Sequence, residues 1–202
     1  KSIDKTKLHL YPCNGTKVFK WSMESGVYEK VHSISMIEEL GQNAYNTILS
    51  SCLEYQSHIS TIHNLPYTGT FLHYRGSMLN WCPIGRSAGS KERDAWVEED
   101  NCFKIRESFL KLLVSDIDNA DIFVTVALGG STSFDIYPSG WDKTYVTNHL
   151  EGYSMIFVGD RCTGTGNDKT LYDMLQPDNS YETKSPEMTI DLINSAIKKS
   201  LA

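Results

Sequence analysis

The sequence predicts an α/β protein that carries an inserted α+β unit built on a mainly antiparallel sheet. The middle of the chain has the pattern helix, hairpin, helix, hairpin, whereas the part after Pro138 alternates strand, helix, strand, helix. The continuous apolar run at residues 155–158 is typical of a buried parallel strand. We therefore assign residues 1–32 and 139–202 to one domain and residues 33–138 to an insertion.

The N-terminal third predicts short strands followed by a long helical stretch. A short strand is expected at residues 8–11, and residues 17–21 and 26–31 form a predicted hairpin. Residues 35–62 lack proline and have apolar residues at helical spacing, which indicates one long helix or two. Gly41 is the weak point of that stretch because glycine disfavours a helix interior.

The remaining elements follow from the same periodicities. Further helices are predicted at residues 90–117, 143–150 and 168–175, and further strands at residues 70–74, 78–80, 123–128 and 133–137. The last helix opens at Ser185-Pro186-Glu187, where Ser185 is the N-cap and Pro186 occupies the first turn.

Length and composition set broad limits on function. The chain has 202 residues, 40% of them hydrophobic, and a formal net charge of −6. Such a length and composition suit a packed soluble protein, and the acidic balance argues against general nucleic-acid binding. No apolar run reaches the roughly 18 residues of a membrane span. The five cysteines are scattered and form no paired motif, which favours a reducing, cytoplasmic compartment.

A loop rich in glycine and acid follows the predicted strand at residues 155–158. Asp160 comes at the carboxyl end of that strand, where open α/β sheets bind ligands. A carboxylate there could hold Mg²⁺, which prefers hard oxygen ligands. Asp168, farther along the loop, is also explained as an ordinary helix N-cap. Both interpretations remain open from the pattern alone.

Polar residues in the middle of the chain could bind an anion or a sugar. Alternation along the strand 133–137 places Ser133 and Asp135 on one face. Arg75, Arg86 and Arg93 lie close together in the sequence, and guanidinium groups suit phosphate. The alternative is ordinary surface polarity: one solvated strand face and three solvated arginines.

Taken together, several long motifs resemble the eukaryotic-type phosphomannomutases of the haloacid dehalogenase superfamily. The matching segments are GTFLHYRGSMLNWCPIGR (69–86), KER (91–93), LGGSTSFDIYPSGWDKTY (128–145) and FVGDRCTGTGND (157–168). The resemblance implies a Rossmann-like core of the haloacid dehalogenase type, with an inserted cap domain that binds the sugar phosphate. It also implies Mg²⁺, a hexose phosphate substrate and a hexose 1,6-bisphosphate activator.

The resemblance assigns roles to individual residues. Arg75, Arg86 and Arg93 would bind the phosphate distal to the chemistry, together with Ser133, Asn80 and, on the sugar hydroxyls, Asp135. Asp160 would be a Mg²⁺ ligand supported by Asn167 and Asp168, and Lys143 would steady the nucleophile and the transferring phosphoryl group. The family's Arg-Asn-Gly turn is Arg75-Gly76-Ser77 here, the lysine after the metal aspartate is Arg161, and Thr165-Gly166 replaces Gly-Gly.

One motif of the family does not occur in these 202 residues. The family begins with D-x-D-G-T, which supplies the aspartate nucleophile and the general acid/base, so we expect both to belong to an N-terminal part that this chain lacks. The resemblance implies interconversion of mannose 6-phosphate and mannose 1-phosphate for GDP-mannose synthesis. The alternatives are a sugar-phosphate phosphatase and a non-catalytic phosphosugar-binding remnant. A homodimer through the cap is expected by analogy, without nucleic-acid or membrane partners.

Overall fold

The computed structural model describes residues 3–164 and 166–200, and the chain divides after Trp141 into two compact units. This division lies close to the boundary that the sequence predicts near residue 138. The assignment of residues 1–32 and 139–202 to one domain stays a prediction. None of the described helices is both long and apolar enough to cross a lipid bilayer.

The first unit begins with two short 3-10 turns and an antiparallel hairpin. The turns are η1 (Lys5–Lys7) and η2 (Cys13–Gly15), and the hairpin strands are β1 (Lys17–Trp21) and β2 (Tyr28–Ser33). Leu10 makes only an isolated bridge with Phe19, so the strand predicted at residues 8–11 does not form. Pro12 explains the difference, because it has no N–H to extend a ladder and it leads directly into the turn η2.

The predicted helical stretch is broken where glycine was expected to weaken it. The two helices are α1 (Met36–Leu40) and α2 (Gln42–Ile62). Gly41 lies between them with a φ of 81°, a conformation that L side chains rarely adopt. Ser35 caps α1 by accepting a hydrogen bond from the Glu38 amide at 3.3 Å.

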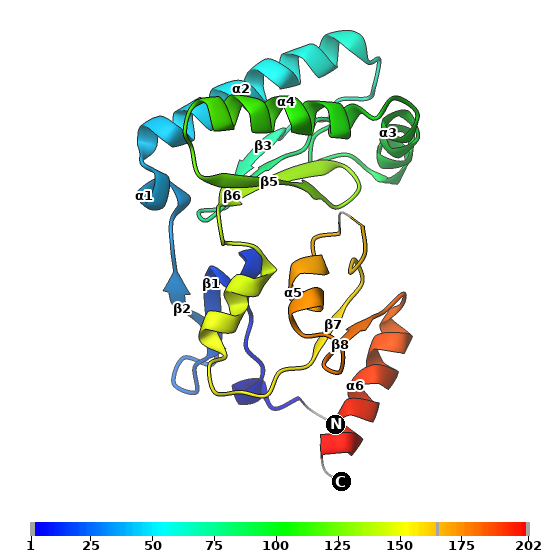
Figure 1. The fold of residues 1–202 in the computed structure, drawn as a ribbon. Coiled ribbons are helices and arrows are strands. Elements are labelled where there is room, and N and C mark those ends of the chain that lie inside the picture. Colours follow the sequence, from blue (N-terminus) through cyan, green and yellow to red (C-terminus); the bar gives the residue numbers. More distant parts are fainter. Residues whose placement is uncertain (1–2, 165, 201–202) are drawn as a thin grey trace. The chain divides into compact units, whose positions relative to one another are not determined.

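A four-stranded antiparallel sheet forms the centre of the first unit. Its strands are β3 (Leu72–Tyr74), β4 (Leu79–Trp81), β5 (Val124–Gly129) and β6 (Ser133–Pro138), in the order β3-β4-β6-β5. Helices α2 and α4 (Ile105–Asn119) lie over one face of this sheet (Figure 1). Helix α3 (Ser90–Phe103) is separated from α4 by Lys104, which has left-handed backbone angles that the sequence did not predict.

The covered face of the sheet and the two helices form one hydrophobic core. Trp81 of β4 stacks on Phe134 of β6 with ring centroids 4.5 Å apart, and both are fully buried. The Trp81 indole donates to the Gln56 side chain of α2 at 2.8 Å, which satisfies its buried N–H. The alternation predicted for β6 is confirmed, because Phe134 and Ile136 belong to this core. Asp135 therefore points to the opposite face.

The second unit is a small α/β arrangement. Its elements are the 3-10 helix η3 (Lys143–His149), β7 (Phe157–Gly159), α5 (Lys169–Met174), β8 (Ser180–Glu182) and α6 (Pro186–Ser200). Strand β7 pairs with β8 in parallel, as predicted, but it begins at Phe157, and Phe157 and Val158 are only partly buried. Ser185 caps α6 by accepting a hydrogen bond from the Met188 amide at 3.2 Å.

Candidate functional site

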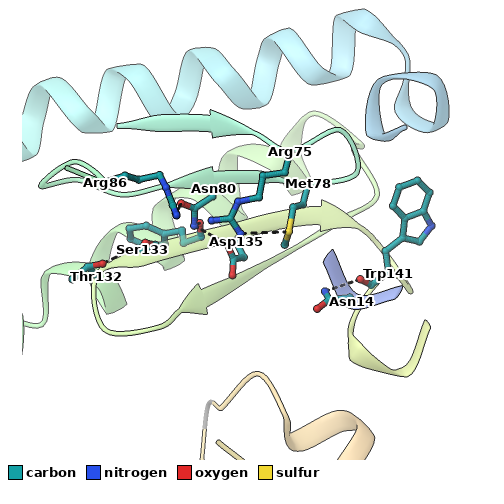
Figure 2. Close-up of polar contacts among 10 residues, drawn as sticks. Asn14, Arg75, Met78, Asn80, Arg86, Thr132, Ser133, Asp135 and Trp141 are labelled. Atoms are coloured by element: carbon teal, nitrogen blue, oxygen red, sulfur yellow. Dashed lines mark hydrogen bonds and ion pairs between the residues drawn. The ribbon is translucent and has the colours of Figure 1, made fainter. Parts of the chain in front are cut away.

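A chain of polar side chains crosses the sheet of the first unit on its open face, which is the face opposite to helices α2 and α4 (Figure 1). The register aligns Asn80 of β4 with Asp135 of β6. Asn80 Nδ2 donates to Asp135 Oδ1 at 2.7 Å and to the Phe134 carbonyl at 3.2 Å, while Asn80 Oδ1 accepts from Arg86 Nη1 at 2.7 Å (Figure 2). Both ends of the amide are therefore used, which orients the guanidinium and the carboxylate on either side of it.

Arg75 reaches the same carboxylate from the turn between β3 and β4. Its Nη1 lies 3.9 Å from Asp135 Oδ1, an ion pair too long to be a close hydrogen bond. The Arg75 and Asp135 side chains are 27% and 18% exposed, so solvent and ligands can reach both. We call the five residues Arg75, Asn80, Arg86, Asp135 and His73, the last described below, the anion cluster.

A glycine fixes the backbone that carries Arg86. Gly85 has a φ of 88°, and a Cβ built on it would lie 2.2 Å from the Gly69 carbonyl oxygen. The two chain segments approach too closely there for any side chain. The Arg86 amide also donates to the Thr70 carbonyl at 3.2 Å, so the exposed Arg86 side chain starts from a well-defined backbone position.

Arg93 and Ser133, both predicted to bind phosphate, lie beside the anion cluster. Arg93 Nε donates to the Ala88 carbonyl at 3.0 Å, and its two terminal nitrogens reach the Arg86 carbonyl at 3.4 Å and Thr132 Oγ1 at 3.3 Å. Thr132 is in turn 3.4 Å from the buried Ser133 hydroxyl. Arg93 thus connects the loop that carries Arg86 to the start of β6.

His73 was not among the residues predicted from the sequence. It pairs with Asn80 across β3 and β4, so its exposed side chain lies in the same row as Asn80 and Asp135. Neighbouring groups partly desolvate the exposed ring, and this desolvation, together with nearby positive charge, lowers the pKa of His73. These charges belong to Arg75, Arg86 and Lys17. Period-two alternation was the available signal, because His73 precedes Arg75 by two residues.

In the second unit, a buried carboxylate organises the glycine-rich loop. Asp168 Oδ2 accepts from the backbone amides of Asp160 and Arg161, each at 3.0 Å, and Asp168 Oδ1 pairs with Lys143 Nζ. Asp168 is only 1% exposed and makes no side-chain capping bond to α5. Its carboxylate therefore holds the end of β7 and Lys143 in place instead of capping the helix.

The glycines allow the loop to approach this carboxylate. A Cβ on Gly159 would lie 2.8 Å from Asp168 Oδ2, and one on Gly166 would lie 2.0 Å from the Arg161 carbonyl oxygen. Either side chain would collide with an atom that has little room to move. Close packing against Asp168 and the Phe157 ring thus accounts for Gly159, and close approach to the Arg161 backbone accounts for Gly166.

The other residues predicted for this site are more open. Asp160 and Asn167 are exposed, and Lys143 is partly buried. Burial lowers the pKa of Lys143, and the negative charge of Asp160 opposes that shift. The nearby carboxylate of Asp160 thus helps to keep the ammonium charged.

The donors near Asp160 determine whether the loop after β7 fits a metal ion. Across the part of the chain that the structure describes, no three His, Cys, Asp or Glu side chains group closely enough to bind a metal ion. Asp160 fits Mg²⁺ as a single hard-oxygen ligand, since its carboxylate is exposed. Asp168 fits a supporting role, because its oxygens already accept from Lys143 and two amides.

Known proteins resemble the chain over nearly all its length. Residues 6–199 match the family model of eukaryotic phosphomannomutase. The phosphomannomutase of Drosophila melanogaster is 33% identical over 81% of this chain and 61% of the relative, and that of Saccharomyces cerevisiae is 35% identical over 82% and 64%. The chain thus spans less than two thirds of the length of these relatives.

A solved structure supports the fold class. An N-terminally truncated Plasmodium falciparum IMP-nucleotidase matches 92% of this chain and 48% of its own, with a TM-score of 0.56 and 12% identity. At that identity the likeness concerns the fold alone, and it confirms the predicted α/β class with a unit built on an antiparallel sheet. Since the family model matches nearly every residue, the chain belongs to the eukaryotic phosphomannomutase family.

Proposed function

We propose that the protein interconverts mannose 6-phosphate and mannose 1-phosphate and so supplies mannose 1-phosphate for GDP-mannose synthesis. The observation that supports this most directly is the anion cluster, in which Asn80 holds Arg86 and Asp135 on an open sheet face. The relatives whose sequences match are phosphomannomutases. The route would pass through an aspartyl-phosphate and a hexose 1,6-bisphosphate.

The anion cluster would bind the phosphate that is not reacting. Arg75 and Arg86 offer planar guanidinium groups that suit two phosphate oxygens at once. Asp135, which is bonded to Asn80 and paired with Arg75, would accept hydrogen bonds from sugar hydroxyls. Arg93 and Ser133 would complete this side of the site, with Arg93 also bracing the loop that carries Arg86.

This arrangement suits a mutase because the intermediate has two phosphates. After the first transfer, the bisphosphate must turn around and present its other phosphate. Arg75 lies 3.9 Å from Asp135, too far for a close hydrogen bond, so its N–H groups can donate to either phosphate. A phosphatase would have no need of such a second phosphate site.

The second unit would support the transfer step. Lys143 would stabilise negative charge on the phosphoryl group and on the carboxylate that attacks it. Asp160 would hold Mg²⁺, with Asn167 and Asp168 supporting, and the ion would neutralise phosphate charge when bound. A hexose 1,6-bisphosphate would act as activator by supplying the first phosphoryl group. A homodimer through the predicted insertion, residues 33–138, is part of the same proposal.

Calorimetry on the 202-residue chain tests the binding half of the proposal. We expect mannose 1-phosphate and mannose 6-phosphate to bind with similar affinity, and mannose not to bind. The chain alone should show no turnover with Mg²⁺ and a bisphosphate activator, because the D-x-D-G-T motif does not occur in it. Failure of both sugar phosphates to bind would refute the proposal, and robust turnover would show that the nucleophile lies elsewhere.

A longer form that contains a D-x-D-G-T segment tests the reaction itself. Phosphorus NMR distinguishes the two possible activities with the same substrate. A mutase converts mannose 1-phosphate into mannose 6-phosphate, whereas a phosphatase accumulates inorganic phosphate. Accumulation of inorganic phosphate without isomerisation would replace the mutase with the phosphatase alternative.

A further inference from the structure

His73 lies in one cross-strand row with Asn80 and Asp135, on the face of the sheet that also carries the two arginines. The strand register sets His73, Asn80 and Asp135 side by side on the open face. Arg75 follows two residues later and so projects from the same face of the chain. The imidazole is exposed, which leaves it accessible to a ligand.

The charged groups around His73 come from several elements. Lys17 of β1 approaches the turn after β3, where its Nζ is 3.3 Å from the position of a Cβ on Gly76. Arg75 and Arg86 contribute two more positive charges, and Asp135 of β6 is the carboxylate in the row. Three cations and one carboxylate thus face a single titratable ring in a protein whose net charge is −6.

We propose that His73 is a specificity-determining residue of the anion cluster, which donates a hydrogen bond to a bound phosphate dianion and takes up a proton from solvent as that dianion binds. This inference rests on the proposed function, since it assumes that the cluster binds the phosphate of a sugar phosphate. The ring would therefore distinguish ligands by their charge: a dianion would favour its protonation more than a singly charged group would.

The direction of the pH effect follows from the neighbours of the ring. In the free protein, desolvation of the ring is the main cause that lowers the pKa of His73, and the three cations lower it further because they disfavour a fourth positive charge. A bound dianion offsets those cations and raises the pKa of the ring. The complex then binds more protons than the free protein, so affinity for the dianion increases as the pH falls through the pKa of the complex. It levels off below the pKa of the free protein.

Sulfate is the probe that isolates the protein's own titration, because its charge stays constant where histidine titrates, whereas that of a phosphate changes. Calorimetry on the 202-residue chain, between about pH 5.5 and 8, should show affinity for sulfate rising by about fivefold toward the acidic end. Buffers with different ionisation enthalpies count the protons taken up. NMR of the imidazole gives the pKa of His73 with and without sulfate.

Two variants make the test specific. His73→Gln keeps a hydrogen-bond donor but cannot titrate, so its sulfate affinity should be flat with pH and its binding should take up no proton. His58→Gln removes another exposed histidine, on helix α2, and should retain the pH dependence of the unaltered chain. An unchanged proton uptake in His73→Gln would overturn the inference.

The same experiment separates this inference from the proposed function. If mannose 6-phosphate binds, and Arg86→Ala weakens that binding, while His73 shows no proton linkage, only the inference on His73 fails. If neither sulfate nor mannose 6-phosphate binds, the proposed function and the inference fail together.

Discussion

The two candidate sites use a carboxylate in opposite ways. In the first unit, Asp135 is the end of a chain of side chains that runs through Asn80 to Arg86. In the second unit, Asp168 is a buried hub that receives Lys143 and two backbone amides directly. The first arrangement distributes its contacts over several residues, whereas the second concentrates them on one.

This difference predicts that the anion cluster adapts to its ligand, whereas the contacts around Asp168 are rigid. Side chains such as Arg75 and Arg86 can change rotamer to follow a ligand that turns around. The backbone amides of Asp160 and Arg161 cannot move without moving the end of β7. We therefore expect substitutions in the anion cluster to change binding more than stability, and substitutions around Asp168 to do the reverse.

The largest effect is expected for Asp168→Ala. It would leave Lys143 and two backbone amides without their acceptor, at a cost of about 3 kcal/mol in the free energy of unfolding, as for a broken buried ion pair. Asp173→Ala is the matched control, because Asp173 pairs with Lys169 on the surface of α5 and both side chains are about half exposed. That control should cost about 0.5 kcal/mol. Urea denaturation measures both, and equal losses would contradict the hub interpretation.

Arg86→Ala should mainly weaken ligand binding. Loss of a charge-assisted phosphate contact at an exposed arginine should cost about 2 kcal/mol, or roughly a 30-fold lower affinity for mannose 6-phosphate. Lys111→Ala removes an exposed cation from helix α4 and serves as the control. If both variants bind equally well, the cluster is not the phosphate site.

Asp100→Asn tests whether the first unit also depends on a buried carboxylate. Asp100 accepts from the amide and the Nε of Arg106, each at 2.7 Å, and Arg106 Nη1 reaches the Gly130 carbonyl at 3.1 Å. This bridge connects the α3–α4 junction to the loop before β6. We expect a loss of about 1.5 kcal/mol in unfolding free energy. Glu107→Gln, in helix α4 next to Arg106, should be neutral, and an equal loss of stability in both variants would show that the Asp100–Arg106 bridge is not what stabilises this junction.

The smallest expected effect is that of Gly129→Ala, which is compared with Gly159→Ala because each glycine lies beside one of the two carboxylates. A Cβ on Gly129 would lie 2.7 Å from Asp135 Oδ2, and a Cβ on Gly159 would lie 2.8 Å from Asp168 Oδ2. Asp135 can swing away, so Gly129→Ala should change stability by about 0.5 kcal/mol and lower sugar-phosphate affinity by roughly threefold. Gly159→Ala should be more destabilising than Gly129→Ala. A Cβ on Gly159 would also lie 2.7 Å from the Phe157 ring, so this substitution meets an aromatic ring as well as a carboxylate. Similar unfolding curves for the two variants would contradict the expected difference.

Periodicity and turn chemistry predicted most elements of the fold. The break at Gly41 was foreseen because glycine has a local signature. The break at Lys104 was not, because a left-handed lysine has no such signature. Lys104 is stabilised by its setting, in which Asp100 and Arg106 bond across the junction. Likewise, the helix predicted at residues 143–150 is the 3-10 helix η3. Side-chain spacing over so few residues does not distinguish a 3-10 helix from an α-helix.

The candidate sites were predictable only in part. Alternation placed Asp135 on a polar face, and the motif of the family indicated Asn80. Neither observation revealed that β4 would lie beside β6, which is a matter of tertiary pairing. His73 was overlooked for that reason, since its importance comes from the neighbour across the strand. The role of Asp168 was obscured by a local alternative, the helix N-cap.

The strand order has a consequence for how the molecule folds. Strands β3–β4 and β5–β6 are pairs of neighbours in the sequence, so each can form early and independently. The β4–β6 pairing joins the two halves, and there Asn80 meets Asp135 across 55 residues of sequence. Closing so long a loop costs entropy, so we expect the β4–β6 pairing to form last. The ligand site therefore matures only with the last step of sheet assembly, and a sugar phosphate would selectively retain chains that have completed it.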